Sequence, residues 1–104
     1  MKGFNSMMKQ AQAMQAKMAK MQEELGEMQM EGSSGGGMVQ VTVNGKQEIL
    51  SIKINPEVVN PEEVDILEDL IMAAITDARD KASKAMEEAM SKVTGGLGLP
   101  PGLL

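Results

Sequence analysis

Four lysines stand in the first 22 residues of this 104-residue chain, and no acidic residue lies among them. These residues are Lys2, Lys9, Lys17 and Lys20. On a helix that turns about 100° per residue, three of them fall within roughly 20° of one line, and Lys17 lies to one side. A stripe of ammonium groups can contact the phosphates of a nucleic acid. Lysines on the outer face of a helix are often merely solvated, so both interpretations stay open.

A second group of cations falls in the C-terminal half of the chain, where each lysine follows an acid by four residues. The pairs are Asp77 with Lys81, Asp80 with Lys84, and Glu88 with Lys92. On a helix such pairs lie side by side and stabilise it by about 0.2–0.5 kcal/mol each. We expect these lysines mainly to support a helix. Arg79 has no acid four residues away, so it is the better candidate there for a further phosphate contact.

The missing residue types exclude most other chemistry. The chain has no cysteine, histidine, tryptophan or tyrosine, and it has one phenylalanine. It therefore lacks the side chains for His- or Cys-based catalysis and for stacking single-stranded nucleic acid. The acids that crowd residues 62–69 favour the positive end of a helix dipole, and without histidine they do not predict a metal site. We expect no enzyme activity, no cofactor, no metal and no small-molecule substrate.

The net charge of −5 divides unevenly, into +4 for residues 1–22 and −9 for the remainder. An acidic total disfavours DNA, but a local lysine cluster can still contact phosphates, because charges in salt solution act over only about 10 Å. The longest apolar run, Leu70–Ile75, is far shorter than the roughly 20 residues that span a bilayer. No secretory signal is visible either. We therefore expect no membrane partner and a cytoplasmic location.

Apolar residues recur in steps of three and four along the first segment, which predicts a helix over residues 4–26. The recurring positions are Phe4, Met7, Ala11, Met14, Met18, Met21, Leu25 and Met28. This set, the methionine seam, has the 3.5-residue period of a helix that packs along one side against another helix. A small chain completes its core by such pairing, most simply with a second copy of itself. Methionine surfaces also suit varied apolar partners, so a protein–protein adaptor or chaperone-like scaffold is the alternative.

Two strands are predicted in the middle of the chain, over the segments 38–44 and 47–54, which flank the hairpin signal Asn44-Gly45. The segment 27–32 is open to two interpretations: Met28 continues the helical period, and the alternation of methionine with polar residues is also typical of a short strand. A two-residue turn pairs Val43 with Lys46, Val41 with Glu48, and Val39 with Leu50. One face then carries Val39, Val41, Val43, Leu50, Ile52 and Ile54. The pattern predicts an antiparallel sheet with one dry face.

A second helix is predicted over residues 61–94. Asn60 is a suitable cap, Pro61 suits the first helical position, and Gly95-Gly96 ends the pattern. Such a helix is about 50 Å long, more than a three-stranded sheet can cover, so its alanine-rich distal half should project and pack on another helix. Residues 1–94 then form a single domain, and the Gly- and Pro-rich segment 95–104 is expected to be a flexible tail.

Four stretches, in this order, carry a resemblance to a known family. They are MMKQAQAMQAKMAKMQEEL (Met7–Leu25), VTVNG (Val41–Gly45), LEDLIMAAITDARDKA (Leu67–Ala82) and TGGLGLPPG (Thr94–Gly102). Together they extend over essentially the whole chain, which is similar to the YbaB/EbfC family of bacterial nucleoid-associated proteins. The resemblance implies an α+β protomer of order α-β-β-β-α with a three-stranded antiparallel sheet. It also implies a homodimer whose two long helices project like tweezer arms.

The resemblance further implies binding to double-stranded DNA, a location in the nucleoid, and roles in nucleoid organisation and gene regulation. The family's DNA contacts are thought to involve basic residues on the projecting helices. Here that role would fall to Lys2, Lys9, Lys17, Lys20, Arg79, Lys81 and Lys84. For the homodimer we expect an interface at Met7, Ala11, Met14, Met18, Met21, Leu25, Val39, Val41, Ile71 and Ile75.

Overall fold

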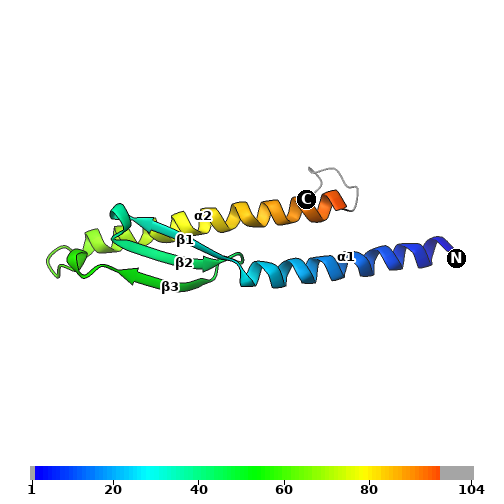
Figure 1. Cartoon of the computed structure of the whole chain (residues 1–104), viewed down its shortest axis with the longest axis horizontal. Coiled ribbons are helices and arrows are strands. Elements are labelled where there is room, and N and C mark those ends of the chain that lie inside the picture. The colour runs from blue at the N-terminus through cyan, green and yellow to red at the C-terminus, as the bar shows by residue number, and fades with distance from the viewer. Residues whose placement is uncertain (1, 97–104) are drawn as a thin grey trace.

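The computed structural model describes residues 2–96 as a helix, a three-stranded antiparallel sheet and a second long helix (Figure 1). The elements are α1 (Lys2–Glu27), β1 (Gln29–Ser34), β2 (Val39–Asn44), β3 (Ile49–Ile54) and α2 (Val64–Gly96), with short 3₁₀ turns at Gly35–Gly37 and Pro56–Val58. The sheet order is β1-β2-β3, with antiparallel neighbours. The predicted α-β-β-β-α order is confirmed. Helix α2 extends two residues into the predicted tail, and the rest of that tail, 97–104, lies outside the described residues.

Two predicted helix boundaries are wrong. Helix α1 passes through Gly26 and ends at Glu27, so β1 begins two residues later than predicted. Helix α2 begins at Val64, three residues after Pro61. The side-chain oxygen of Asn60 accepts the N–H of Glu62 at 3.0 Å, and its carbonyl accepts the next N–H at 2.9 Å. These bonds close a turn that leads into the helix, whereas the prediction places the same residues in the first helical turn.

The predicted hairpin register is also wrong. The observed partners are Val43 with Ile49, Val41 with Ile52, and Val39 with Ile54. Relative to the predicted pairing, the partner of Val41 has moved by four residues. Because side chains alternate between faces with a period of two, an even shift leaves the same residues on the same face. The predicted apolar face therefore survives a wrong register.

The side chain of Asn44 explains the longer turn. Its Oδ1 accepts the N–H groups of Lys46 and Glu48 at 2.9 and 3.0 Å, and its Nδ2 donates to the Glu48 carboxylate at 2.8 Å. Gln47 takes a left-handed backbone conformation with φ of 67°. The loop thus closes around a buried Asn44 side chain. The adjoining strand pair has a β-bulge between Thr42 and Val43. A two-residue turn does not need either feature.

The core lies where α2 crosses β1 and β2. Three valines of β2 and three alanines of α2 are fully buried: Val39, Val41, Val43, Ala74, Ala78 and Ala82. Gly32 of β1 lies directly beneath the helix, and a Cβ there would overlap the backbone nitrogen of Ala78. The small residues on both sides therefore let the backbones of strand and helix come into contact. Only glycine fits at position 32.

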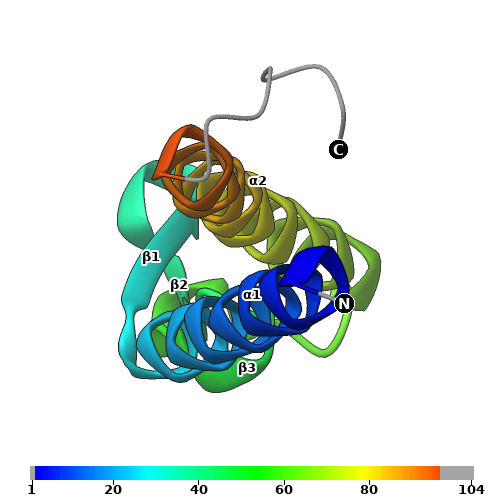
Figure 2. The same ribbon diagram turned by 90° about the vertical axis from the view of Figure 1, so that its right-hand side faces the viewer.

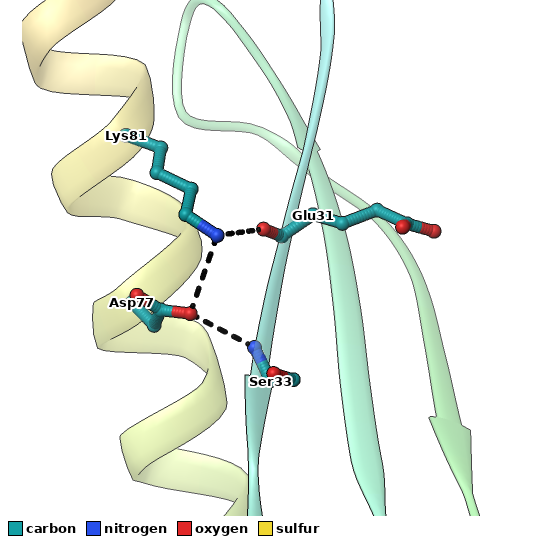
Figure 3. Close-up of polar contacts among 4 residues, drawn as sticks. All are labelled: Glu31, Ser33, Asp77 and Lys81. Carbon is teal, nitrogen blue, oxygen red and sulfur yellow. Dashed lines mark hydrogen bonds and ion pairs between the residues drawn. The ribbon is translucent and has the colours of Figure 1, made fainter. Parts of the chain in front are cut away.

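Helix α2 also closes the outer edge of β1 (Figure 3). The Asp77 carboxylate accepts the N–H of Ser33 at 3.0 Å, and the Lys81 ammonium donates to the carbonyl of Glu31 at 2.7 Å. The two side chains form an ion pair at 3.5 Å. They thus occupy two of the backbone groups that the outer edge of β1 would offer to another chain.

Strand β3, in contrast, is uncovered. Helix α2 packs on β1 and β2, and every residue of β3 is exposed. Ile52 and Ile54 lie beside the buried valines of β2 on the same face, yet Ile52 is 43% exposed. The predicted dry face is therefore dry on β2 and open on β3, within one protomer.

The two helices project from the same end of the sheet and run antiparallel to each other (Figures 1 and 2). The strands of six residues are about 20 Å long, whereas the 33 residues of α2 extend about 50 Å. The molecule measures 72 × 22 × 17 Å. Helix α1 is tied to the sheet at its base, where the carbonyl of Leu25 accepts the N–H of Gly45 at 2.7 Å. Most of α1 is an arm with little cover from its own chain.

We predict that Gly32→Ala destabilises the fold by about 1–3 kcal/mol, because the new methyl group must push α2 away from β1. Thermal unfolding followed by circular dichroism at fixed protein concentration measures the difference in stability. Gly3→Ala is the matched control, since a Cβ at Gly3 has no neighbour within 4 Å. Equal melting temperatures for the two variants would contradict the close approach of α2 and β1.

The edge contact predicts a pH dependence. The Ser33 N–H bond, aided by Lys81, holds the pKa of Asp77 below its ordinary value of 3.8. A lowered folded-state pKa means that ionised Asp77 stabilises the fold above about pH 4, and that this contribution is lost as the pH falls further. Asp77→Asn keeps an oxygen that can accept from Ser33 but cannot ionise. It should lower the melting temperature at pH 7, and the difference from the unmodified protein should shrink below pH 4.

Asp80→Asn is the control for this measurement, because Asp80 is exposed on the same helix. It should leave the melting curve unchanged at both pH values. A constant difference between the Asp77 variant and the unmodified protein across this pH range would show that the charge of Asp77 contributes nothing.

Candidate nucleic-acid interface

The lysine stripe of α1 lies along the projecting arm. Lys9, Lys17 and Lys20 are exposed, and Lys2 is the first residue of the helix. Helix formation follows from the run of alanine, glutamine, methionine and lysine, which all have high helix propensity. The described part of the arm contains no acid before Glu23. None of these lysines forms an ion pair in the described chain, although Glu24 and Glu88 lie near Lys17 and Lys20.

The three predicted cation sites on α2 separate in the structure. The Lys81 ammonium is held against β1 by Glu31 and Asp77, so this lysine supports the fold. Arg79 and Lys84 are exposed, but five residues place them roughly 140° apart around the helix. They do not form one surface. Helix α1 carries Lys9, Lys17 and Lys20 as exposed side chains on one helix.

Of the three predicted acid–lysine pairs, the described residues form one. Asp77 and Lys81 are paired, and neither the Asp80–Lys84 nor the Glu88–Lys92 ion pair is present in that part of the chain. The prediction is therefore wrong for the other two pairs. For exposed residues the small Coulomb gain does not outweigh the entropy of holding two long side chains together.

A groove of about 290 Å³ separates the base of α1 from the distal half of α2. Lys17 and Lys20 of α1 line it together with Lys92 of α2. The other lining residues are Met21, Glu24, Met28, Ala85, Glu88, Ala89 and Val93. Lys92 was not among the residues predicted for this site. Its spacing of three and seven residues from Ala89 and Ala85 places it on the inner side of α2 and could have identified it.

The predicted interface residues fall into two groups. Met21, Leu25, Val39 and Val41 are buried within the protomer, and Ile71 and Ile75 pack against its core. Met7 and Ala11 are exposed, and Met14 and Met18 are half-buried. The first group therefore holds one chain together, and only the outer part of the methionine seam is available to a second copy. The exposed apolar side of β3 was not predicted, because alternation along a strand does not reveal how many strands a helix covers.

Charge is separated along the molecule. The acids of residues 62–69 lie at the start of α2, at the opposite end from the tips of the two helices (Figure 1). With a length of 72 Å, this separation is several times the screening length of about 10 Å at 0.1 M salt. A polyanion that meets the arms is thus little affected by the acidic end. Among the described residues there is no cluster of three or more side chains that could hold a metal, and no helix is long and apolar enough to cross a membrane.

Comparisons with known proteins identify the family and support the fold. The chain is 58% identical over 102 residues to the nucleoid-associated protein amb4104 of Paramagnetospirillum magneticum, covering 98% of this chain and 95% of that protein. It is 54% identical over 102 residues to a nucleoid-associated protein of Bradyrhizobium sp. strain BTAi1, covering 98% and 96%. The crystal structure of the uncharacterized protein HP0035 from Helicobacter pylori superposes with a TM-score of 0.65 at 21% identity, covering 77% of this chain and 93% of that one, and supports the fold.

The sequence profile of the YbaB/EbfC DNA-binding family matches residues 1–97, which include both helices, the whole sheet and the lysine stripe. That family is defined by DNA binding and is not a family of enzymes, in keeping with the absence of histidine and cysteine. By its profile, its relatives and its α-β-β-β-α fold, this chain belongs to the YbaB/EbfC DNA-binding family of nucleoid-associated proteins.

Proposed function

We propose that the protein binds double-stranded DNA as a homodimer through the phosphate backbone. The observation that carries this proposal is the set of exposed lysines Lys9, Lys17 and Lys20 on α1, a helix that projects from the sheet and points away from the acidic end. Each lysine that neutralises a phosphate releases counterions, and this release supplies most of the affinity of non-specific binding. The contacts fall to Lys2, Lys9, Lys17 and Lys20, with Arg79 and Lys84 as weaker candidates.

The uncovered side of β3 supports the homodimer. Leu50, Ile52 and Ile54 are between 37% and 50% exposed on a strand whose outer edge has no partner in the described chain. Phe4 and Met7, on the outer part of the methionine seam, are more than 60% exposed. An edge strand with apolar side chains is a natural place for pairing with a second copy. The closed edge of β1 leaves β3 as the available side of the sheet.

A homodimer would place two lysine-bearing arms at a fixed separation. Arms that contact phosphates at two points can bend DNA or hold two segments together, because the added contacts offset the cost of deforming the duplex. Such binding suits a role in nucleoid organisation and, through DNA shape, in gene regulation. Lysine contacts phosphates as a point charge and lacks the rigid fork of donors with which arginine reads guanine, so sequence preference should be weak. The adaptor alternative gains no support from relatives named nucleoid-associated proteins.

Binding to DNA should depend steeply on salt. If about four to six phosphates are neutralised, the logarithm of the affinity falls with the logarithm of salt at a slope of roughly −4 to −5. We expect Lys9→Glu combined with Lys20→Glu to weaken duplex binding by on the order of tenfold or more. A mobility-shift titration at several salt concentrations measures both quantities.

Lys46→Glu combined with Lys53→Glu is the matched control, because it changes the net charge equally but lies on the β2–β3 hairpin. This control should retain most of the affinity. Equal losses for the two double variants would mean that total charge, and not the α1 stripe, governs binding.

The dimer should depend on β3. We expect the protein to sediment at twice the 11.1 kDa mass of the chain, and Ile52→Asp to sediment as a single chain, since a buried carboxylate opposes association. Ser51→Asp, on the other face of the same strand, should remain dimeric. If the unmodified protein sedimented as a stably folded single chain at micromolar concentrations, the proposed homodimer would be contradicted.

A further inference from the structure

The groove between α1 and α2 is a second cationic feature, which shares Lys17 and Lys20 with the lysine stripe and adds Lys92 of α2. It unites Lys17 and Lys20 with Lys92, which comes from the other end of the sequence. Glu24 and Glu88 also line it, so the charged residues of the groove sum to +1. No single helix would show this combination, because the three lysines belong to two antiparallel elements.

Lys92 is available to bind an anion. It is exposed, and the ion pair with Glu88 that its spacing suggests is absent from the described residues. The apolar floor below it includes Met21, which is 4% exposed, and the half-buried Ala89. Such a floor keeps part of the solvent away from the ammonium groups, so that an anion between them is attracted more strongly than on an open surface.

From this arrangement we infer that the groove is a phosphate subsite, in which Lys92 joins Lys17 and Lys20 around one backbone phosphate of the bound duplex. This inference rests on the proposed function and adds a contact from α2 to it. Charge complementarity identifies the occupant, and continuity supports it, since Lys20 belongs both to the stripe and to the groove. The volume of 290 Å³ is about ten times that of a water molecule in the liquid and accommodates a phosphate with its nearest waters.

The groove contains both acids and lysines, so substitutions of the two kinds should change the duplex affinity in opposite directions. Glu88→Gln removes a repulsion and should strengthen duplex binding, whereas Lys92→Gln removes an attraction and should weaken it. Glu63→Gln, at the far end of the molecule near the start of α2, should change nothing. An outer stripe alone would not respond in this way to residues of the inner groove.

The decisive comparison is Lys92→Gln against Lys84→Gln. Both lysines are exposed on α2, both variants change the charge equally, and only Lys92 lines the groove. We expect Lys92→Gln to lower duplex affinity at least threefold more than Lys84→Gln. It should also reduce the magnitude of the salt slope by about 0.9 for each phosphate that is no longer neutralised, while Lys84→Gln changes the slope less. Circular dichroism of each variant checks that the helices are intact.

Methyl spectra of methionine locate the bound duplex directly in the unmodified protein. Adding a short duplex should shift the signals of Met21 and Met28 in the groove and leave Met72, which is 65% exposed elsewhere on α2, unchanged. If the protein binds duplex but the Lys92 and Lys84 variants lose affinity equally and the groove methyls do not shift, the subsite is overturned and the proposed function stands. If the unmodified protein fails to retard duplex at low salt, the proposed function and the subsite fall together.

Discussion

The close contact between α2 and β1 is the constraint on which the rest of this structure depends. Gly32 lets the helix backbone approach to a distance that no side chain would allow, and Ala78 meets it there. Fixing the helix over β1 and β2 has two consequences. It brings Asp77 and Lys81 to the outer edge of β1, which they close, and it leaves β3 without cover. A single close contact thus decides which edge of the sheet is covered within the protomer.

With its first half fixed on the sheet, the distal half of α2 projects beyond the sheet as an arm. Because the sheet supports only about 20 Å of a helix that is about 50 Å long, the remainder must project. Helix α1 returns alongside it, held at its base by Leu25 and Gly45 and otherwise little covered. The two helices therefore leave a groove between them, whose charged rim and apolar floor come from both ends of the chain. Elongation is what makes this surface possible in only 104 residues.

Elongation also resolves the apparent conflict between an acidic chain and a polyanionic partner. Net charge describes a molecule at distances greater than its own size, whereas phosphate contacts are made within a few ångströms. The acids near residues 62–69 lie at the end of the molecule opposite the tips of the two helices. A rounder fold of the same composition would bring these charges within one screening length and weaken the attraction to DNA.

Local patterns in the sequence determined the order of the elements, the helical lysine stripe, the apolar sides of the strands and the family, because each depends on residues close together in the chain. Side-chain alternation even survived the wrong hairpin register, since the error at Val41 and Val39, beyond the β-bulge, was four residues. The tertiary structure alone decided which valines α2 buries. It also decided that Lys81 donates a hydrogen bond to β1, and that Lys92 lines the same groove as Lys17 and Lys20. These outcomes depend on how far a helix reaches across a sheet and on where two helices that are distant in sequence meet. Packing between such segments sets these distances, and a pattern of neighbouring residues contains no information on it.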